Sequence, residues 1–169
     1  MTEHYPTLLE MAPWHKTYPV TRIDGWNIFR GPKIWSIVPD GYVVIRSNEP
    51  KISLHTLIEQ SDKKFFVLLF DGIDHGDTTS DTKSLADELK KEFLDLIDCF
   101  VVTRYYESVQ YDPINNILGD IDMSLENKFG ATGQSIYVVD PEKNIVWKSC
   151  GLMKEEFRKW LANTRSANA

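Results

Sequence analysis

The chain has 169 residues, of which 42% are hydrophobic and 26% are charged. This composition is typical of one ordinary globular domain with its own core, and it excludes a fibrous or wholly disordered chain. The net charge of -6 at pH 7 argues against nucleic acid or an anionic membrane as the main partner, because phosphate binding requires clustered Lys and Arg.

Residues 1–40 are rich in proline and aromatic residues, and we expect them to form an N-terminal arm. Five prolines in this segment forbid a long helix, and so many aromatic residues are untypical of a disordered tail. We expect the arm to pack on a domain formed by residues 41–169, either permanently or as a lid. Its large aromatic residues are Tyr5, Trp14, Tyr18, Trp26, Phe29 and Trp35.

From residue 65 onward, the pattern predicts elements in the order β-α-β-α-β-β-α. The run Phe65–Phe70 is apolar without alternation, which is typical of a central strand buried on both faces. Apolar residues then recur at three- and four-residue steps and predict a helix over 81–97. The other predicted elements are a strand over 41–45, a short helix over 52–60, a strand over 99–105, a loop over 106–121, a short helix over 124–129 capped by Gly130, a hairpin of 134–139 and 144–148, and a last helix over 152–161. Parallel strands followed by an antiparallel hairpin predict a thioredoxin-like α/β fold, with a central mixed sheet flanked by helices.

The cysteine content does not fit the usual chemistry of that fold. The chain has only Cys99 and Cys150, and it has no Cys-x-x-Cys motif. An active thioredoxin carries its nucleophilic cysteine directly after the central strand, where a helix N-terminus lowers the thiol pKa. The matching positions, Asp71–Asp77, contain no cysteine, and Gln134 and Ser135 occupy the place of the usual cis-proline. We therefore expect no thiol–disulfide exchange and no peroxidase chemistry of the peroxiredoxin type.

Several short segments follow one another in an order that a known family shares. They are Ser53-Leu-His-Thr-Leu-Ile, Phe66-Val-Leu-Leu-Phe, Gly130-Ala-Thr-Gly-Gln-Ser, Ile145-Val-Trp-Lys and Gly151-Leu-Met-Lys-Glu-Glu-Phe-Arg-Lys-Trp-Leu. Together, over roughly residues 39–161, they resemble the C-terminal thioredoxin-like domain of FAD-dependent aromatic hydroxylases of the phenol hydroxylase type. The turn Val139-Asp-Pro-Glu-Lys departs from the Arg-Pro-Asp-Gly turn of that family.

The resemblance implies a redox-inactive module, which in that family supports dimerisation and packs beside the flavin domain. The sequence has no Gly-x-Gly-x-x-Gly motif, so we expect a stand-alone module without a flavin domain or a bound cofactor. The favoured hypothesis is a cytoplasmic homodimer that binds a small aromatic molecule beside a flavin-dependent hydroxylase or a polyketide-type pathway. The candidate ligand-binding residues are Trp26, Trp35, Arg22, Tyr105, Gln134 and Ser135. The aromatic residues of the arm would equally serve to cover the core of their own domain.

The loop after the central strand supports a second hypothesis, in which the chain is an enzyme. His75 with Asp71 or Asp74 would form an acid–base pair, the carboxylate fixing the tautomer of the imidazole. Such a pair would suit a cofactor-independent isomerase, cyclase or lyase acting on a small molecule. Two alternatives stay open for the same loop: its carboxylates also suit the start of a helix, and an oxygen-rich cluster also suits Mg²⁺ or Mn²⁺. We predict no metal site, and we expect neither nucleic acid nor a membrane as a partner.

Overall fold

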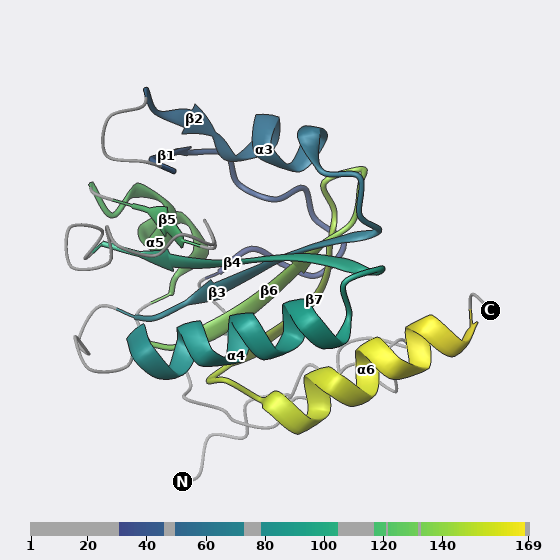
Figure 1. The fold of residues 1–169 in the computed structure, drawn as a ribbon. Coiled ribbons are helices and arrows are strands. Elements are labelled where there is room, and N and C mark those ends of the chain that lie inside the picture. The colour runs from purple at the N-terminus through teal and green to yellow at the C-terminus, as the bar shows by residue number, and fades with distance from the viewer. Residues whose placement is uncertain are drawn as a thin grey trace, which may run out of the picture.

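The structure, a computed structural model, describes residues 31–45, 50–72, 79–104, 117–120, 122–131 and 133–167. Helices and strands alternate along this part of the chain (Figure 1). The strands are β1 (Tyr42–Val43), β2 (Ile52–Ser53), β3 (Phe65–Phe70), β4 (Ile97–Thr103), β5 (Ile117–Gly119), β6 (Ser135–Val139) and β7 (Ile145–Cys150). The helices are α3 (Leu54–Gln60), α4 (Thr79–Glu92), α5 (Ser124–Phe129) and α6 (Lys154–Ala167).

Five of the strands form one mixed sheet in the order β5-β4-β3-β6-β7. β3 runs parallel to β4, and β4 runs parallel to β5. β6 is antiparallel to β3, and β7 completes an antiparallel hairpin with β6. The predicted fold class, a central mixed sheet flanked by helices, is therefore confirmed.

A strap formed by residues 31–45 reaches both outer edges of this sheet. At one edge, Ile37 forms a bridge with Asn144, and the backbone N–H of Val38 donates to the carbonyl of Lys143 at 2.8 Å. At the other edge, Val44 and Gly119 exchange backbone hydrogen bonds of 3.0 and 2.8 Å. The strap thus satisfies backbone groups that an open edge strand would leave exposed. Residues 1–30 of the predicted arm lie outside the described residues.

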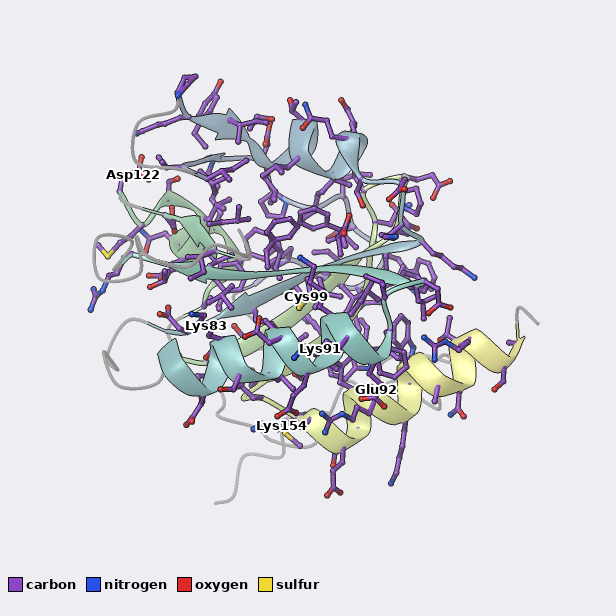
Figure 2. The ribbon with its side chains drawn as sticks, in the orientation of Figure 1. Lys83, Lys91, Glu92, Cys99, Asp122 and Lys154 are labelled. Atoms are coloured by element: carbon purple, nitrogen blue, oxygen red, sulfur yellow. The ribbon has the colours of Figure 1, made fainter. Side chains whose placement is uncertain are left out.

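The sheet separates two apolar cores. α4 and α6 cover one face, and α3 and α5 cover the other (Figure 1). All six residues of β3 are buried, as its continuous apolar sequence predicted, and they alternate between the two cores. Where α6 packs on the sheet, the ring of Trp147 in β7 contacts the ring of Phe157 in α6, with the two centroids 4.9 Å apart. Cys99 lies between the sheet and α4 (Figure 2), where burial raises the pKa of its thiol.

Several element boundaries differ from the prediction, among them the last helix, which covers Lys154–Ala167 rather than 152–161. Three differences have identifiable reasons. Helix α4 ends at Glu92 rather than at residue 97, because Ile97 pairs with Phe65 as the first residue of β4. Ile52 and Ser53 do not belong to a helix, because they pair with β1. The predicted loop over 106–121 contains β5, whose three residues are too few to give a periodic signal. No helix in the described ranges is long and apolar enough to span a membrane.

Candidate functional site

The parallel strands bring polar residues together at one edge of the sheet. Asp71 follows β3, Arg104 follows β4 and Asp120 follows β5. The backbone ties these ends in register, because the N–H of Asp71 donates to Val102 at 3.3 Å and the N–H of Asp120 donates to Thr103 at 2.9 Å. Parallel strands end at the same edge, which lies on the left in Figure 1 and is where ligands bind in many open α/β sheets. We call Asp71, Arg104, Asp120 and the neighbouring Glu126 of α5 the carboxyl edge.

Asp120 fastens the start of α5 to the sheet. One oxygen of its carboxylate accepts a hydrogen bond from the backbone N–H of Leu125 at 3.1 Å, and the other accepts one from Glu126 at 2.8 Å. These N–H groups belong to the first helical turn, where the helix itself supplies no acceptor. Asp120 is fully buried, and this burial raises its pKa although the two hydrogen bonds oppose the shift. Both oxygens of Asp120 therefore hold the first turn of α5 in place.

Glu126, unlike Asp120, is a buried carboxyl group whose oxygens do not hold another described element in place. Its side chain is only 1% exposed, and neither Oε1 nor Oε2 has a hydrogen-bond partner among the described residues. Burial raises the pKa of this carboxyl to about 7, and the charges of Asp120 and Asp71 act in the same direction, while Arg104 opposes them. A carboxyl group with such a pKa holds or releases a proton close to neutral pH.

Glu126 was not predicted from the sequence, although a weak signal for it exists. Leu125 and Phe129 stand four residues apart and form the buried stripe of the short helix α5. Glu126 directly follows the first of them, so it stands at the margin of that stripe rather than on the outer face. A glutamate in this position of a helix that begins five residues after a buried strand end is a candidate for a buried carboxyl.

The corner that carries cysteine chemistry in active thioredoxins lies next to the carboxyl edge. Phe70, the last residue of β3, pairs with Ser135, the first residue of β6. Gln134 donates from Nε2 to the Oγ1 of Thr82 in the first turns of α4, at 3.2 Å. The two segments are in close contact, since a Cβ built on Gly72 would lie 2.9 Å from the carbonyl carbon of Gly133. The predicted neighbours Asp71, Gln134 and Ser135 are thus brought together.

This corner holds neither a cis peptide bond nor a cysteine pair in the part of the chain that the structure describes. Neither cysteine forms a disulfide. Cys99 pairs with Val67 in the middle of the sheet and belongs to the core under α4. Cys150 ends β7, opposite Ser135, and is half-buried. The two thiols therefore lie on different strands, Cys99 in β4 and Cys150 at the end of β7, and they do not form a Cys-x-x-Cys site.

The other predicted site residues have different outcomes. His75 and Asp74, as well as Trp26, Arg22 and Tyr105, lie outside the described residues. Trp35 belongs to the strap, where its backbone N–H donates to Ile145 at the start of β7, whereas Ser135 pairs with the end of that strand. Trp35 is therefore at the opposite end of β7 from Gln134 and Ser135. Within the described ranges, no three His, Cys, Asp or Glu side chains are arranged to hold a metal ion.

Comparison with known proteins supports the fold assignment. No protein-family model and no curated protein sequence matches the chain. The chain is similar to the solved structure of peroxidoxin BcpB from Mycobacterium tuberculosis, with 16% identity and a TM-score of 0.59 over 79% of this chain and 97% of that one. Reduced 2-Cys peroxiredoxin from Plasmodium vivax gives 13% identity and a TM-score of 0.58 over 81% and 99% of the two chains. Yeast Sco1 gives 14% identity and a TM-score of 0.54 over 78% of this chain and 96% of that one. At such identities, these similarities establish a thioredoxin-like fold and nothing about activity.

The close contact at Gly72 gives a first prediction. Gly72 has a φ of +87°, and an added Cβ would meet backbone atoms of Gly133 and Gln134 at 2.9–3.1 Å. Replacement of Gly72 by Ala should therefore reduce the free energy of unfolding by about 2 kcal/mol or more. The matched control is Gly133→Ala, because a Cβ there meets no atom within 4 Å. Urea denaturation followed by circular dichroism measures both variants, and equal losses would contradict this account.

The raised pKa of Glu126 gives a second prediction, on the pH dependence of stability. The ordinary value for a Glu is 4.5 and the value here is about 7, so between these two pH values the unfolded chain loses this proton more readily than the folded one. The contribution of Glu126 to stability should therefore fall as pH rises from 4.5 to about 7 and change no further above that range. Replacing Glu126 with Gln should remove this decline, making the variant more stable than wild type at pH 8 by up to about 3 kcal/mol.

The same denaturation series, run across pH on wild type, Glu126→Gln and Glu155→Gln, tests this. Glu155 serves as the control, because it is an exposed glutamate in the first turn of α6. Parallel stability curves for all three proteins would show that Glu126 titrates like an ordinary surface carboxyl.

Proposed function

We propose that the chain catalyses proton transfer on a small molecule at the carboxyl edge, without the use of a thiol. The observation that supports this most is Glu126, a buried carboxyl with free acceptor oxygens and a pKa of about 7. General acids and bases work best when their pKa lies near the operating pH. Carboxyl groups that neighbouring charges hold in different protonation states are a frequent basis for separate acid and base roles.

In this proposal, Glu126 in its protonated form is the acid and the Asp71 carboxylate is the base. Asp71 removes a proton from a carbon of the substrate, and Glu126 gives its proton to another atom of the same molecule. The substrate is isomerised with no net gain or loss of protons. Transfer of a proton from Asp71 to Glu126, directly or through water, restores the starting state. Asp120 touches neither proton and positions Glu126 through the start of α5.

The arrangement of the thiols also favours this chemistry over thiol exchange. Exchange requires a thiolate, and burial of Cys99 raises the pKa of that thiol, which disfavours its ionisation. Asp71 directly follows β3, so a carboxylate lies at the end of the central strand, after which an active thioredoxin carries its cysteine. Proton transfer uses the same edge of the sheet with oxygen instead of sulfur.

A solvent-exchange assay tests this proposal without knowledge of the physiological substrate. A panel of small ketones is incubated with the protein in D₂O, and deuterium incorporation beside the carbonyl is followed by NMR. We expect catalysed exchange for part of the panel, with a rate that falls about 100-fold or more in Glu126→Gln and in Asp71→Asn.

The controls separate this chemistry from thiol chemistry and from unfolding. The double variant Cys99→Ser, Cys150→Ser should keep the wild-type exchange rate, and so should Glu155→Gln. Loss of exchange in the cysteine variant, with wild-type rates in Glu126→Gln, would overturn the proposal.

A binding and assembly role is the second candidate, and exposed apolar residues of the strap favour it. Trp35 is 51% exposed and Ile37 is 59% exposed, next to each other along the edge of β7. Large apolar side chains in water favour association, and here a second copy of this chain is the proposed occupant. Such a dimer would agree with the resemblance to the C-terminal domain of phenol-hydroxylase-type enzymes, whose aromatic substrates and flavin domains would then suggest the ligand and the partner.

The dimer gives a prediction of its own. Sedimentation of the wild-type chain should show a concentration-dependent dimer, because association buries Trp35 and Ile37. The double variant Trp35→Ser, Ile37→Ser should remain monomeric, while Leu94→Ser, which removes an exposed apolar residue at the end of α4, should dimerise as wild type does. A strictly monomeric wild type at high concentration would eliminate the second candidate.

A further inference from the structure

The charges at the carboxyl edge limit what kind of ligand can bind there. Among the described residues, the charge of Glu126 is influenced by two other carboxyl groups, those of Asp120 and Asp71, and by one guanidinium, that of Arg104, and all three carboxyl groups are buried. Each comes from a different element: Asp71 from the end of β3, Asp120 from the end of β5 and Glu126 from α5, with Arg104 at the end of β4. When the carboxyl groups are ionised, the formal sum is negative. A carboxylate or phosphate ligand would therefore be repelled.

The hydrogen bonds already made at the carboxyl edge further limit which ligands can bind there. The oxygens of Asp120 already accept bonds from α5, and Arg104 donates from Nη1 to the sulfur of Met123 at 3.4 Å. Neither oxygen of Glu126 has a hydrogen-bond partner among the described residues, although Glu126 is buried and only 1% exposed. A buried acceptor without a donor is costly, so a ligand that supplies donors is favoured there. A carboxylate accepts most strongly from a charged N–H group.

There is also open space close to the site. Gly133 contacts Gly72, the residue after Asp71, and a Cβ built on Gly133 meets no heavy atom within 4 Å. A side chain at position 133 would therefore begin in open space with respect to the described residues, whereas Gly72 itself is tightly packed.

We propose that the carboxyl edge recognises the ammonium group of a small amine, with Glu126 as its acceptor and Asp71 as the second negative group. This inference rests on the proposed function, because it names the substrate class of the same site. The N–H donors of the amine satisfy the Glu126 oxygens, and its charge offsets the excess of carboxylates. In a substrate that carries an amine beside the position of proton transfer, the ammonium would stabilise the Glu126 carboxylate that remains after Glu126 has given its proton to the substrate.

Three probes of equal length test the inference: butylamine, butan-1-ol and butyrate. The protein is labelled with ¹³C at the glutamate side-chain carboxyls, and the Glu126 signal, assigned by its loss in Glu126→Gln, is titrated with pH alone and with each probe. We expect saturable binding of butylamine, which shifts the Glu126 titration to lower pH because an ammonium stabilises the carboxylate. Butan-1-ol should bind more weakly and butyrate should not bind. In Glu126→Gln, the affinity for butylamine should fall about tenfold or more, as expected for loss of a charged hydrogen bond.

The outcomes separate the inference from the proposed function. The inference is overturned if butylamine leaves the Glu126 titration unchanged, if butyrate binds as well as butylamine, or if Glu126→Gln binds the amine as wild type does. In these cases, a Glu126 titration near neutral pH would still support proton transfer. A Glu126 that titrates as an ordinary surface glutamate would count against both. If Glu126→Gln folds poorly, the Glu126 signal is assigned by triple-resonance NMR of the wild-type protein, whose titration then decides the matter.

Discussion

The parallel pairing of β3, β4 and β5 is the constraint on which the rest of the structure depends. Because the three strands run in one direction, the residues that follow them, Asp71, Arg104 and Asp120, reach the same edge although they are far apart in sequence. The backbone hydrogen bonds of Asp71 to Val102 and of Asp120 to Thr103 fix their register. A one-residue slip of either strand would turn these side chains to the other face of the sheet. Charge at this edge is thus a consequence of topology.

Such a concentration of acid is unfavourable for folding, and the structure offsets it in different ways. On burial, the Asp120 carboxylate loses its hydrogen bonds to water and accepts hydrogen bonds from two backbone N–H groups, which would otherwise have no acceptor at the start of α5. Glu126 takes up a proton, since burial and its acidic neighbours raise its pKa to about 7. The continuous apolar core around β3 stabilises the domain enough to tolerate the remaining cost. A buried acid that no structural role explains is a frequent mark of a functional position.

The sequence predicted those features that depend on local pattern. The apolar run of Phe65–Phe70, the order of the elements after it apart from β5, and the left-handed cap at Gly130 are confirmed, because each is decided by a few neighbouring residues. β5 and Glu126 were missed, since both depend on distant contacts. Ile117–Gly119 forms a strand because β4 and Val44 pair with it, and Glu126 is buried because Asp120 draws the start of α5 onto the sheet. Neither relation leaves a periodic signal in the sequence.

The thioredoxin-like scaffold therefore need not determine the chemistry that it carries. The position after the central strand is useful to any reactive group, because it lies at the end of a rigid, buried strand and beside the first turn of a helix. Here, Asp71 directly follows the central strand, and the neighbouring buried acid Glu126 comes from α5 rather than α4. Burial raises the pKa of Glu126 most, and the charges of Asp120 and Asp71 raise it further, so Asp120 helps to keep a proton on Glu126. A contact that first serves to begin a helix thus also sets the protonation state of the neighbouring acid.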